Sequence, residues 1–277
     1  MVVLSAFDVA LASGLVLVAG IVSLGLGLRL ERRLGLAALH TVVQLLLIGH
    51  VLRWVFSAEH VILIFGMMLL MVVAAARSAV QRPSRTFRGM FGHALFTLAL
   101  TGFVATLTVT HLIIGIEPWY QPRYLIPLLG MILGNSLTGL SLCLDHLLEA
   151  FDRDRASIEM ELALGASRWE AAEAPMREAV RKGMMPTINT MTVVGVVSLP
   201  GLMTGQILAG ADPMEAVMYQ IVVMFMIAVT SALGSMLISV LAYRAVFDRC
   251  HRLRSERVWL RSRWGSVGEQ RSRRVAA

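Results

Sequence analysis

Seven long apolar runs, separated by short polar segments, constrain the fold of this chain more than any other feature. The runs cover approximately residues 7–28, 34–52, 61–76, 92–116, 124–148, 187–211 and 215–243. Most of them have the roughly 17–25 residues that a helix needs to cross the hydrocarbon core of a bilayer. Over 277 residues, 57% are hydrophobic and only 16% are charged, which excludes an ordinary soluble domain. We therefore predict an all-α integral membrane protein with about seven transmembrane helices.

Basic residues are confined to alternate connections between these runs. Of the 25 lysines and arginines, all but Arg53 and Arg123 follow the first, third, fifth or seventh run. The positive-inside rule places those connections in the cytoplasm, with the N-terminus outside and the C-terminus inside. We divide the chain into a transmembrane domain, 1–247, and a basic cytoplasmic tail, 248–277. Anionic lipid headgroups account for the tail's charge, and no recognition module indicates a nucleic-acid partner.

One hydrophilic insert of helical character, 149–186, interrupts the apolar sequence. Ser167 and Glu170 have the spacing of a capping box, which predicts that a helix begins there. Just upstream, Gly165 can take the left-handed conformation that closes a preceding helix. Pro175 then interrupts the second helix or starts a new one. These signals predict a helix-turn-helix, and its periodicity alone equally fits an amphipathic helix lying on the cytoplasmic leaflet.

The chain has no nucleotide-binding loop of its own. A phosphate-binding Walker A loop needs a lysine followed by serine or threonine, whereas the only lysine, Lys182, is followed by Gly183. The spans also lack the motifs of an intramembrane enzyme, such as a nucleophile elbow or a zinc-binding H-E-x-x-H. We predict a protein that is not an enzyme and that binds no cofactor itself. If ATP and magnesium drive it, they are bound by a partner.

The first half of the insert resembles the coupling motif of ATP-binding-cassette (ABC) permeases. The stretch Glu159 to Ser167 reads EMELALGAS, with Met160 and Glu161 in place of the motif's two alanines. In that family, the short helix of the motif inserts into a cleft on a separate ATPase subunit. The resemblance implies a docking role for five residues: Glu159, Gly165, Ala166, Ser167 and Trp169.

A longer stretch is similar to the signature of the bacterial iron-export ABC permease family, whose plant relatives contribute to aluminium tolerance. Residues 194–213 read VGVVSLPGLMTGQILAGADP, and 126–135 (IPLLGMILGN) and 44–49 (QLLLIG) also fit, so that the resemblance covers about 34–247. It implies an inner-membrane permease, a homodimer paired with ATPase subunits, that exports iron or a related metal. The alternatives are an ATP-independent transporter or channel, and an ABC permease for a non-metal solute such as a nucleotide sugar.

A proline and two glycines in the sixth run suggest a place for the transport pathway. Pro200 removes one backbone hydrogen bond and frees a carbonyl about one turn earlier, as in the broken helices of many transporters. Gly201 and Gly205 are spaced for close helix contact. Plain packing or permease dimerisation explains this glycine pair better than contact with a substrate.

Polar residues in the fifth run suggest a second place. Asn135 and Asp145 share one helix face, with His146 beside them. Asp145 lies near the cytoplasmic end of the run, where a solvated carboxylate at a helix end is the simpler interpretation. The alternative interpretation is that Asp145 captures a cation. No compact set of His, Asp and Glu appears in the sequence, so the metal ligands are left unknown.

Overall fold

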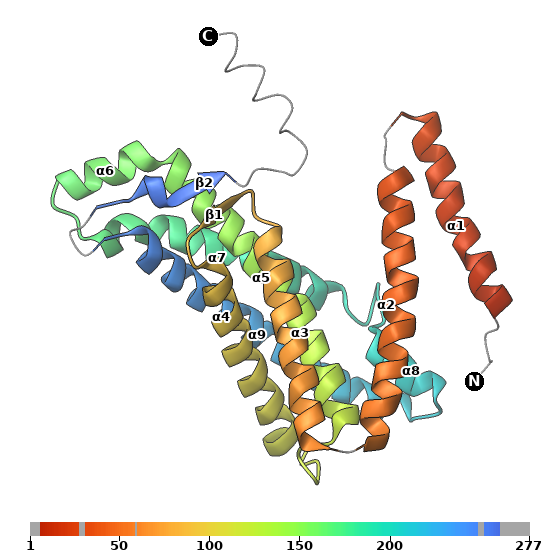
Figure 1. The fold of residues 1–277 in the computed structure, drawn as a ribbon. Helices are drawn as coiled ribbons and strands as arrows, with labels where there is room; N and C mark the ends of the chain where they lie inside the picture. The colour runs from red at the N-terminus through yellow and green to blue at the C-terminus, as the bar shows by residue number, and fades with distance from the viewer. Residues whose placement is uncertain (1–5, 28–30, 59, 249–251, 261–277) are drawn as a thin grey trace.

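The computed structural model describes residues 6–27, 31–58, 60–248 and 252–260 (Figure 1). Nine α-helices are found in this part of the chain: α1 Ala6–Gly25, α2 Glu31–Ala58, α3 Val61–Gln81, α4 Met90–Leu107, α5 Pro122–Arg153, α6 Arg155–Ala163, α7 Arg168–Val193, α8 Gly201–Leu208 and α9 Pro213–Val246. A π-helical turn, η1 (Thr108–Ile113), continues α4, and a 3-10 turn, η2 (Ser255–Arg257), follows α9. Two short strands, β1 (Arg85–Phe87) and β2 (Val258–Leu260), form an antiparallel pair. The predicted helical membrane fold is confirmed.

Five helical segments are long and apolar enough to cross a membrane within the described residues. They are Leu34–Ser57, Val61–Gln81, Met90–Ile113, Pro122–Arg153 and Pro213–Val246, and they match the second, third, fourth, fifth and seventh predicted runs. The first run gives a shorter apolar helical stretch, Leu11–Gly25. A multi-span chain is therefore established, and the count of seven stays a prediction.

The sixth run differs from the prediction of one span over 187–211. Helix α7 starts in the hydrophilic insert and continues through Pro175 and Pro186 to Val193, so the predicted interruption at Pro175 is wrong. Residues 194–200 are then not helical, and α8 begins after Pro200. Gly195 takes a left-handed φ of 85°, and Pro200 has no amide hydrogen to donate. These two residues divide the run into two helices.

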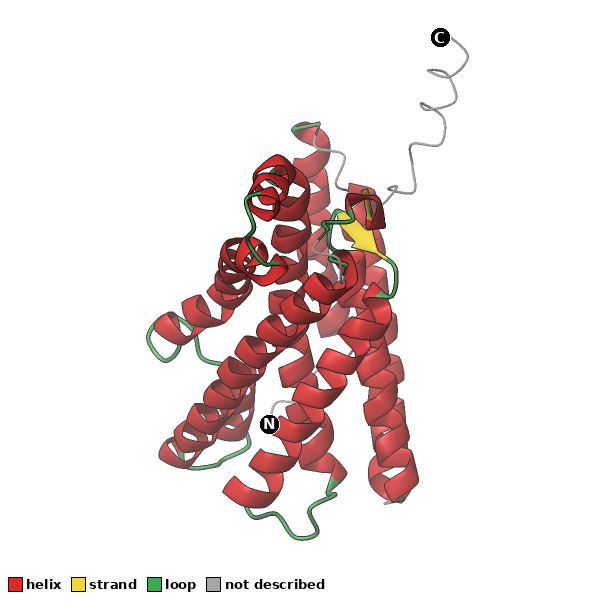
Figure 2. Ribbon diagram, turned by 90° about the vertical axis from the view of Figure 1, so that its left-hand side faces the viewer, coloured by secondary structure: helices red, strands yellow, loops and turns green. Residues whose placement is uncertain are grey.

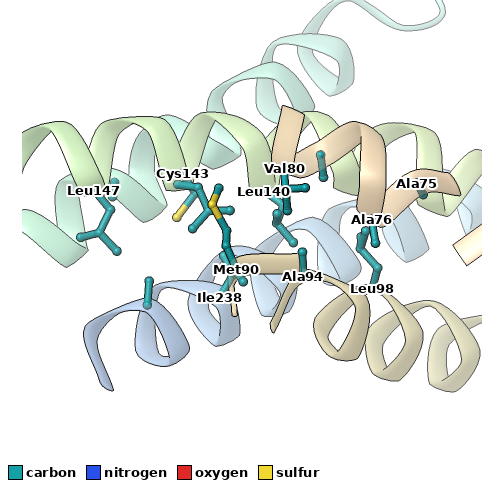
Figure 3. Close-up of a cluster of buried hydrophobic side chains, with 14 of the residues drawn as sticks. Ala75, Ala76, Val80, Met90, Ala94, Leu98, Leu140, Cys143, Leu147 and Ile238 are labelled. Atoms are coloured by element: carbon teal, nitrogen blue, oxygen red, sulfur yellow. The ribbon is translucent and has the colours of Figure 1, made fainter. Parts of the chain in front are cut away.

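The core lies where α3, α4, α5, α7 and α9 cross. Figure 3 shows small side chains between these helices, among them Ala76 of α3, Ala94 of α4 and Cys143 of α5, together with Leu140 and Ile238. All five are almost completely buried. Small side chains allow helix backbones to approach closely. Such close van der Waals packing helps to hold helices together in a membrane, where lipid chains are as apolar as the side chains and the hydrophobic effect does not favour association.

The N-terminal hairpin of α1 and α2 stands apart from this core (Figure 1). Only the last turns of α2 reach the core, through buried Val55 and its neighbours Leu52 and Phe56. Elsewhere most of the described apolar side chains of both helices are exposed. Surfaces of this kind suit contact with lipid chains.

The polar connections gather at one end of the molecule, which we call the α6 end. Helix α6 and the β1–β2 pair both lie there (Figures 1 and 2). Arg85 of β1 pairs with Leu260 of β2, so residues that follow the predicted boundary at 247 belong to the folded body rather than to a simple tail. The remainder of the predicted tail, 261–277, lies outside the described residues.

Candidate functional site

The α6–α7 turn, residues 164–167, closes α6 by a Schellman motif. Gly165 adopts a left-handed φ of 98°, and its amide donates to the carbonyl of Leu162 at 3.2 Å. The next amide, that of Ala166, donates to the carbonyl of Glu161 at 3.0 Å. This pair of bonds satisfies carbonyls that the end of a helix otherwise leaves open. The prediction of a glycine-closed turn is confirmed.

Helix α7 opens with the predicted capping box. The amide of Glu170 donates to Oγ of Ser167 at 3.3 Å, and the amide of Ser167 donates to Oε2 of Glu170 at 2.7 Å. The Ser167 backbone amide, and then its side chain, lower the pKa of the Glu170 carboxyl. Because both ends of the turn have their backbone groups satisfied, its shape is fixed by this chain alone.

An exposed apolar tip projects from the turn. The side chain of Leu164 is 81% exposed and that of Met160 is 58% exposed. Of the residues predicted to dock, Glu159 lies on the same helix and pairs with Arg155 at 2.7 Å. Leu164 and Met160 were missed from the sequence, since they read as ordinary helix formers. An apolar projection among charged residues is suited to insertion into a cleft on another protein.

Trp169 lies at the start of α7 and contacts α9. Its ring meets that of Tyr243 edge-on at 5.6 Å, and Tyr243 and Phe151 both contact Phe247. The guanidinium of Arg168 lies 5.9 Å from the Tyr243 ring centroid. This aromatic junction (Phe151, Trp169, Tyr243 and Phe247) attaches the α6–α7 turn to the ends of α5 and α9. Trp169 is still 46% exposed, so one side of its ring remains accessible.

Further along, α7 meets α5 and α9 at a seam formed by Gly139, Cys143, Gly183 and Ser235. A methyl group placed on Gly183 would lie 2.8 Å from the carbonyl oxygen of Gly139 and from Oγ of Ser235, and 2.9 Å from Cβ of Cys143. A methyl on Gly139 would lie 2.7 Å from the carbonyl oxygen of Gly183. Helices α5 and α7 therefore touch backbone to backbone, and the side chain of Ser235 brings α9 against both. The serines of α9, spaced four residues apart at 231, 235 and 239, were the available signal for this seam.

One uninterrupted helix joins the turn to the seam. Helix α7 has 26 residues, which corresponds to about 39 Å at 1.5 Å per residue. One turn beyond the seam, Oγ1 of Thr187 donates to Oγ of Ser231 at 3.2 Å, which adds a second polar contact with α9. A displacement of the α6–α7 turn would thus reach α5 and α9 through a single rigid element.

The predicted pathway residues of α5 mostly serve the fold. Nδ2 of Asn135 donates to the carbonyl of Met131 in its own helix at 2.9 Å. Oδ1 of Asp145 accepts the amide and the hydroxyl of Ser84, both at 2.8 Å. Through these two bonds Asp145 anchors the α3–α4 connection. His146 lies beside it, half-buried.

The predicted pathway residues of the sixth run lie elsewhere. Gly201 and Gly205 are exposed on α8, and Pro200 precedes that helix. Within the described residues, no hydrogen bond joins these three to Asn135 or Asp145. Nor does this part of the chain contain a group of three His, Cys, Asp or Glu side chains that could hold a metal ion.

A groove of about 820 Å³ runs along α4, η1 and α9. Its lining is apolar apart from three threonines, Thr101, Thr108 and Thr230, and includes no charged side chain. Such a surface fits an acyl chain or a hydrophobic helix better than a metal cation.

Comparison with known proteins gives one family and several relatives. Residues 6–247 match the model of a family described as an uncharacterised protein family, UPF0014. The chain is 36% identical to the UPF0014 membrane protein YjkA of Bacillus subtilis, over 78% of this chain and 85% of that protein. It is 34% identical to the probable iron export permease protein FetB of Escherichia coli, over 89% and 93% of the two chains. It is 32% identical to the protein ALUMINUM SENSITIVE 3 of Arabidopsis thaliana, over 87% and 86%. No solved structure matches the chain.

Proposed function

This chain belongs to the UPF0014 family of membrane proteins, and on that premise we propose that it is the permease subunit of an ABC transporter that exports iron or a related metal. The name of the FetB relative supports the substrate and the direction. ATP and magnesium would be bound by a separate subunit, because this sequence has no lysine in a phosphate-binding loop. The chain itself would carry out transport and no bond-making chemistry.

In this proposal the α6 end faces the cytoplasm of the cell, and the permease sits in the inner membrane as a homodimer. The concentration of arginines in the segments of the α6 end supports that orientation. The N-terminus would lie outside and the C-terminus inside. Each copy would then present its α6–α7 turn to one ATPase subunit.

The observation that carries the proposal is the exposed tip of the α6–α7 turn, held on a rigid helix. Leu164 protrudes from a turn whose backbone is fixed by the Schellman motif and the capping box. An ATPase cleft that buries Leu164 would move α7 when the ATPase closes on its nucleotide. At the seam, Gly183 is in backbone contact with Gly139 and lies against Ser235, so α5 and α9 would shift with it. Access to the pathway would then alternate between the two sides of the membrane.

The test is co-purification of the permease with an ABC ATPase subunit, followed by replacement of the tip. Leu164→Glu places a charge where the proposal needs an apolar contact, and we expect the amount of bound ATPase to fall by about tenfold or more. Leu164→Met keeps the apolar surface and should retain binding. Because Leu164 is exposed in this chain, neither change should unfold the permease. Full ATPase binding by Leu164→Glu would contradict the docking role.

Transport itself is tested in proteoliposomes that contain the assembled complex. We expect Fe²⁺ to move only when ATP is present on the side of the α6 end. Movement of Fe²⁺ without ATP would support an ATP-independent transporter instead. ATP hydrolysis that iron does not stimulate, together with no iron movement, would support a permease for a different solute.

A further inference from the structure

The non-helical segment 194–200, which we call the helix break, lies between α7 and α8 in the sixth apolar run. From Gly183 at the seam to Val193, α7 advances about 15 Å, whereas α9 extends about 33 Å from Ser235 back to Pro213. The break is thus roughly halfway between the seam and the far end of the bundle. Leu202, two residues beyond it, packs against a buried cluster that includes Val223 of α9.

The backbone of the break is only partly satisfied. Its amides are bonded locally, with Gly195 donating to Ser198 at 2.9 Å and Val197 donating to Val193 at 2.9 Å. The carbonyls are different: among the described residues, no backbone amide and no side chain donates to those of residues 195, 196, 197 and 199. Lipid chains cannot supply donors, so irregular backbone at this depth needs protein or water beside it.

The side chains of the break argue against water. Val196 is 91% exposed, Val197 is 78% exposed, and Leu199 is also exposed. Helix α8, which follows, buries none of its residues. A wide aqueous passage lined by valine and leucine would be unfavourable, because each exposed apolar side chain loses about 1.5–3 kcal/mol relative to burial. The open carbonyls disfavour lipid, the apolar side chains disfavour water, and a protein surface satisfies both.

Helix α8 adds a face suited to close helix contact. Gly201 and Gly205 are exposed and four residues apart, and a methyl group on either would meet nothing within 4 Å in this chain. Glycines at this spacing allow two helix backbones to approach each other in a membrane. No described residue of this chain occupies the face they create.

We propose that the helix break and α8 form the contact with a second copy of this chain, which locates the homodimer of the proposed function and rests on that function. An ATPase subunit docked at the α6 end cannot reach this depth, whereas a second copy brings the same face by two-fold symmetry. Ser198 has the only polar side chain in the break. In a two-fold contact its hydroxyl can donate to one of the open carbonyls of the second copy.

The test is cysteine cross-linking of the full chain in native membranes, with Cys250 replaced by serine and the buried Cys143 retained. We expect Val197→Cys to give a disulfide-linked dimer on mild oxidation. Phe225→Cys, which is exposed in the α4–α9 groove, is the matched control and should remain monomeric. Cross-linking through position 225 and not 197 would overturn the proposal.

A second measurement uses the glycines. Gly205→Leu should weaken the association constant of the dimer in nanodiscs by at least about tenfold, which corresponds to a loss of 1.4 kcal/mol. Gly66→Leu, at an equally open position on α3, should leave it unchanged. An undiminished dimer in Gly205→Leu with an unchanged melting temperature would contradict the proposed surface. A chain that cross-links at 197 but binds no ATPase would uphold this dimer contact and reject the proposed function. ATPase binding without cross-linking at 197 would uphold the proposed function and reject this dimer contact.

Discussion

The two ends of α7 are built in opposite ways. At its N-terminus, the N-cap Ser167 and Glu170 satisfy each other's backbone amides, and Gly165 closes the helix before it. At its last residue, Val193, the chain turns through Gly195 into an apolar break with open carbonyls. The first end is structurally complete within this chain, whereas the second is complete only with another surface beside it. The comparison teaches that one helix can be completed by its own sequence at one end and, on the proposed dimer contact, by a second copy at the other.

Between the two ends, the seam at Gly183 gives the strongest test, because it decides whether α7 acts as one rigid element. We expect Gly183→Ala to lower the free energy of unfolding by about 1–3 kcal/mol, the usual cost of overpacking. Its methyl would lie within 2.9 Å of backbone and side-chain atoms of α5 and α9. Thermal unfolding in detergent or nanodiscs measures this loss.

Gly66→Ala is the matched control for that change. Gly66 lies in α3, where a methyl meets nothing within 4 Å, and alanine is the better helix former by up to about 1 kcal/mol. We expect it to be neutral or stabilising. If Gly183→Ala behaves in the same way as Gly66→Ala, the seam is not a rigid contact and α7 cannot transmit motion through it.

The next test compares the two left-handed glycines that flank α7. Gly165 and Gly195 have φ values of 98° and 85°, and both have open space around them. Alanine at either position should cost about 1–2 kcal/mol through backbone strain alone. Because the backbone strain is similar in the two variants, any difference in function should come from the two ends of α7. Gly165→Ala should weaken ATPase binding, and Gly195→Ala should weaken dimerisation.

Co-purification and the dimer fraction in nanodiscs measure the two effects in the same preparations. The contrast fails if both variants lose the same property. It also fails if Gly195→Ala alone reduces ATPase binding, because the break would then belong to the docking apparatus.

The sequence predicted the first end of α7 well because its determinants are local. A capping box spans four residues, and a glycine-closed turn needs only one residue with an available left-handed conformation. Both signals can be recognised without knowing what packs against them. The composition likewise predicted a helical membrane protein.

The second end and the seam could not be predicted in the same way. Apolar composition over 187–211 indicates a membrane environment, but it does not indicate whether the helix is continuous. Pro200 suggested a broken helix, but not the seven-residue break over 194–200. The contact of Gly183 with Gly139 joins residues 44 positions apart. Asp145 meets Ser84 across 61 positions, which is why its role as a loop anchor was missed. Such contacts depend on how the helices cross, and that crossing has no short-range signature.

A smaller effect is expected from removing the cap. Ser167→Ala should destabilise the first turn of α7 by about 1 kcal/mol, because the Glu170 amide loses its acceptor. Amide hydrogen exchange should rise in the first turn of α7 and not in α9. Thr192→Ala, near the other end of the helix, is the control: its hydroxyl is exposed and only donates back to Ile188, so a change within 0.5 kcal/mol is expected. Equal effects of the two changes would mean that the first end is not specially fixed.

Acid should loosen the same end of α7 while leaving the other end unchanged. The pKa of Glu170 is lowered in the folded state by the Ser167 amide. A carboxyl with a lowered folded pKa stabilises fully above its unfolded pKa, and that stabilisation is lost as the pH falls through the folded value. Protection factors of the first-turn amides, corrected for intrinsic exchange, should therefore fall over this acid range. Glu170→Gln cannot ionise and should abolish the pH dependence at that turn.

Asp154 also has a lowered pKa, owing to its hydrogen bond with Arg153. A global unfolding curve would therefore mix the titration of both groups, and only the residue-level exchange measurement isolates the cap. Acid-dependent exchange that persists in Glu170→Gln would assign the effect to Asp154 and the end of α5 instead.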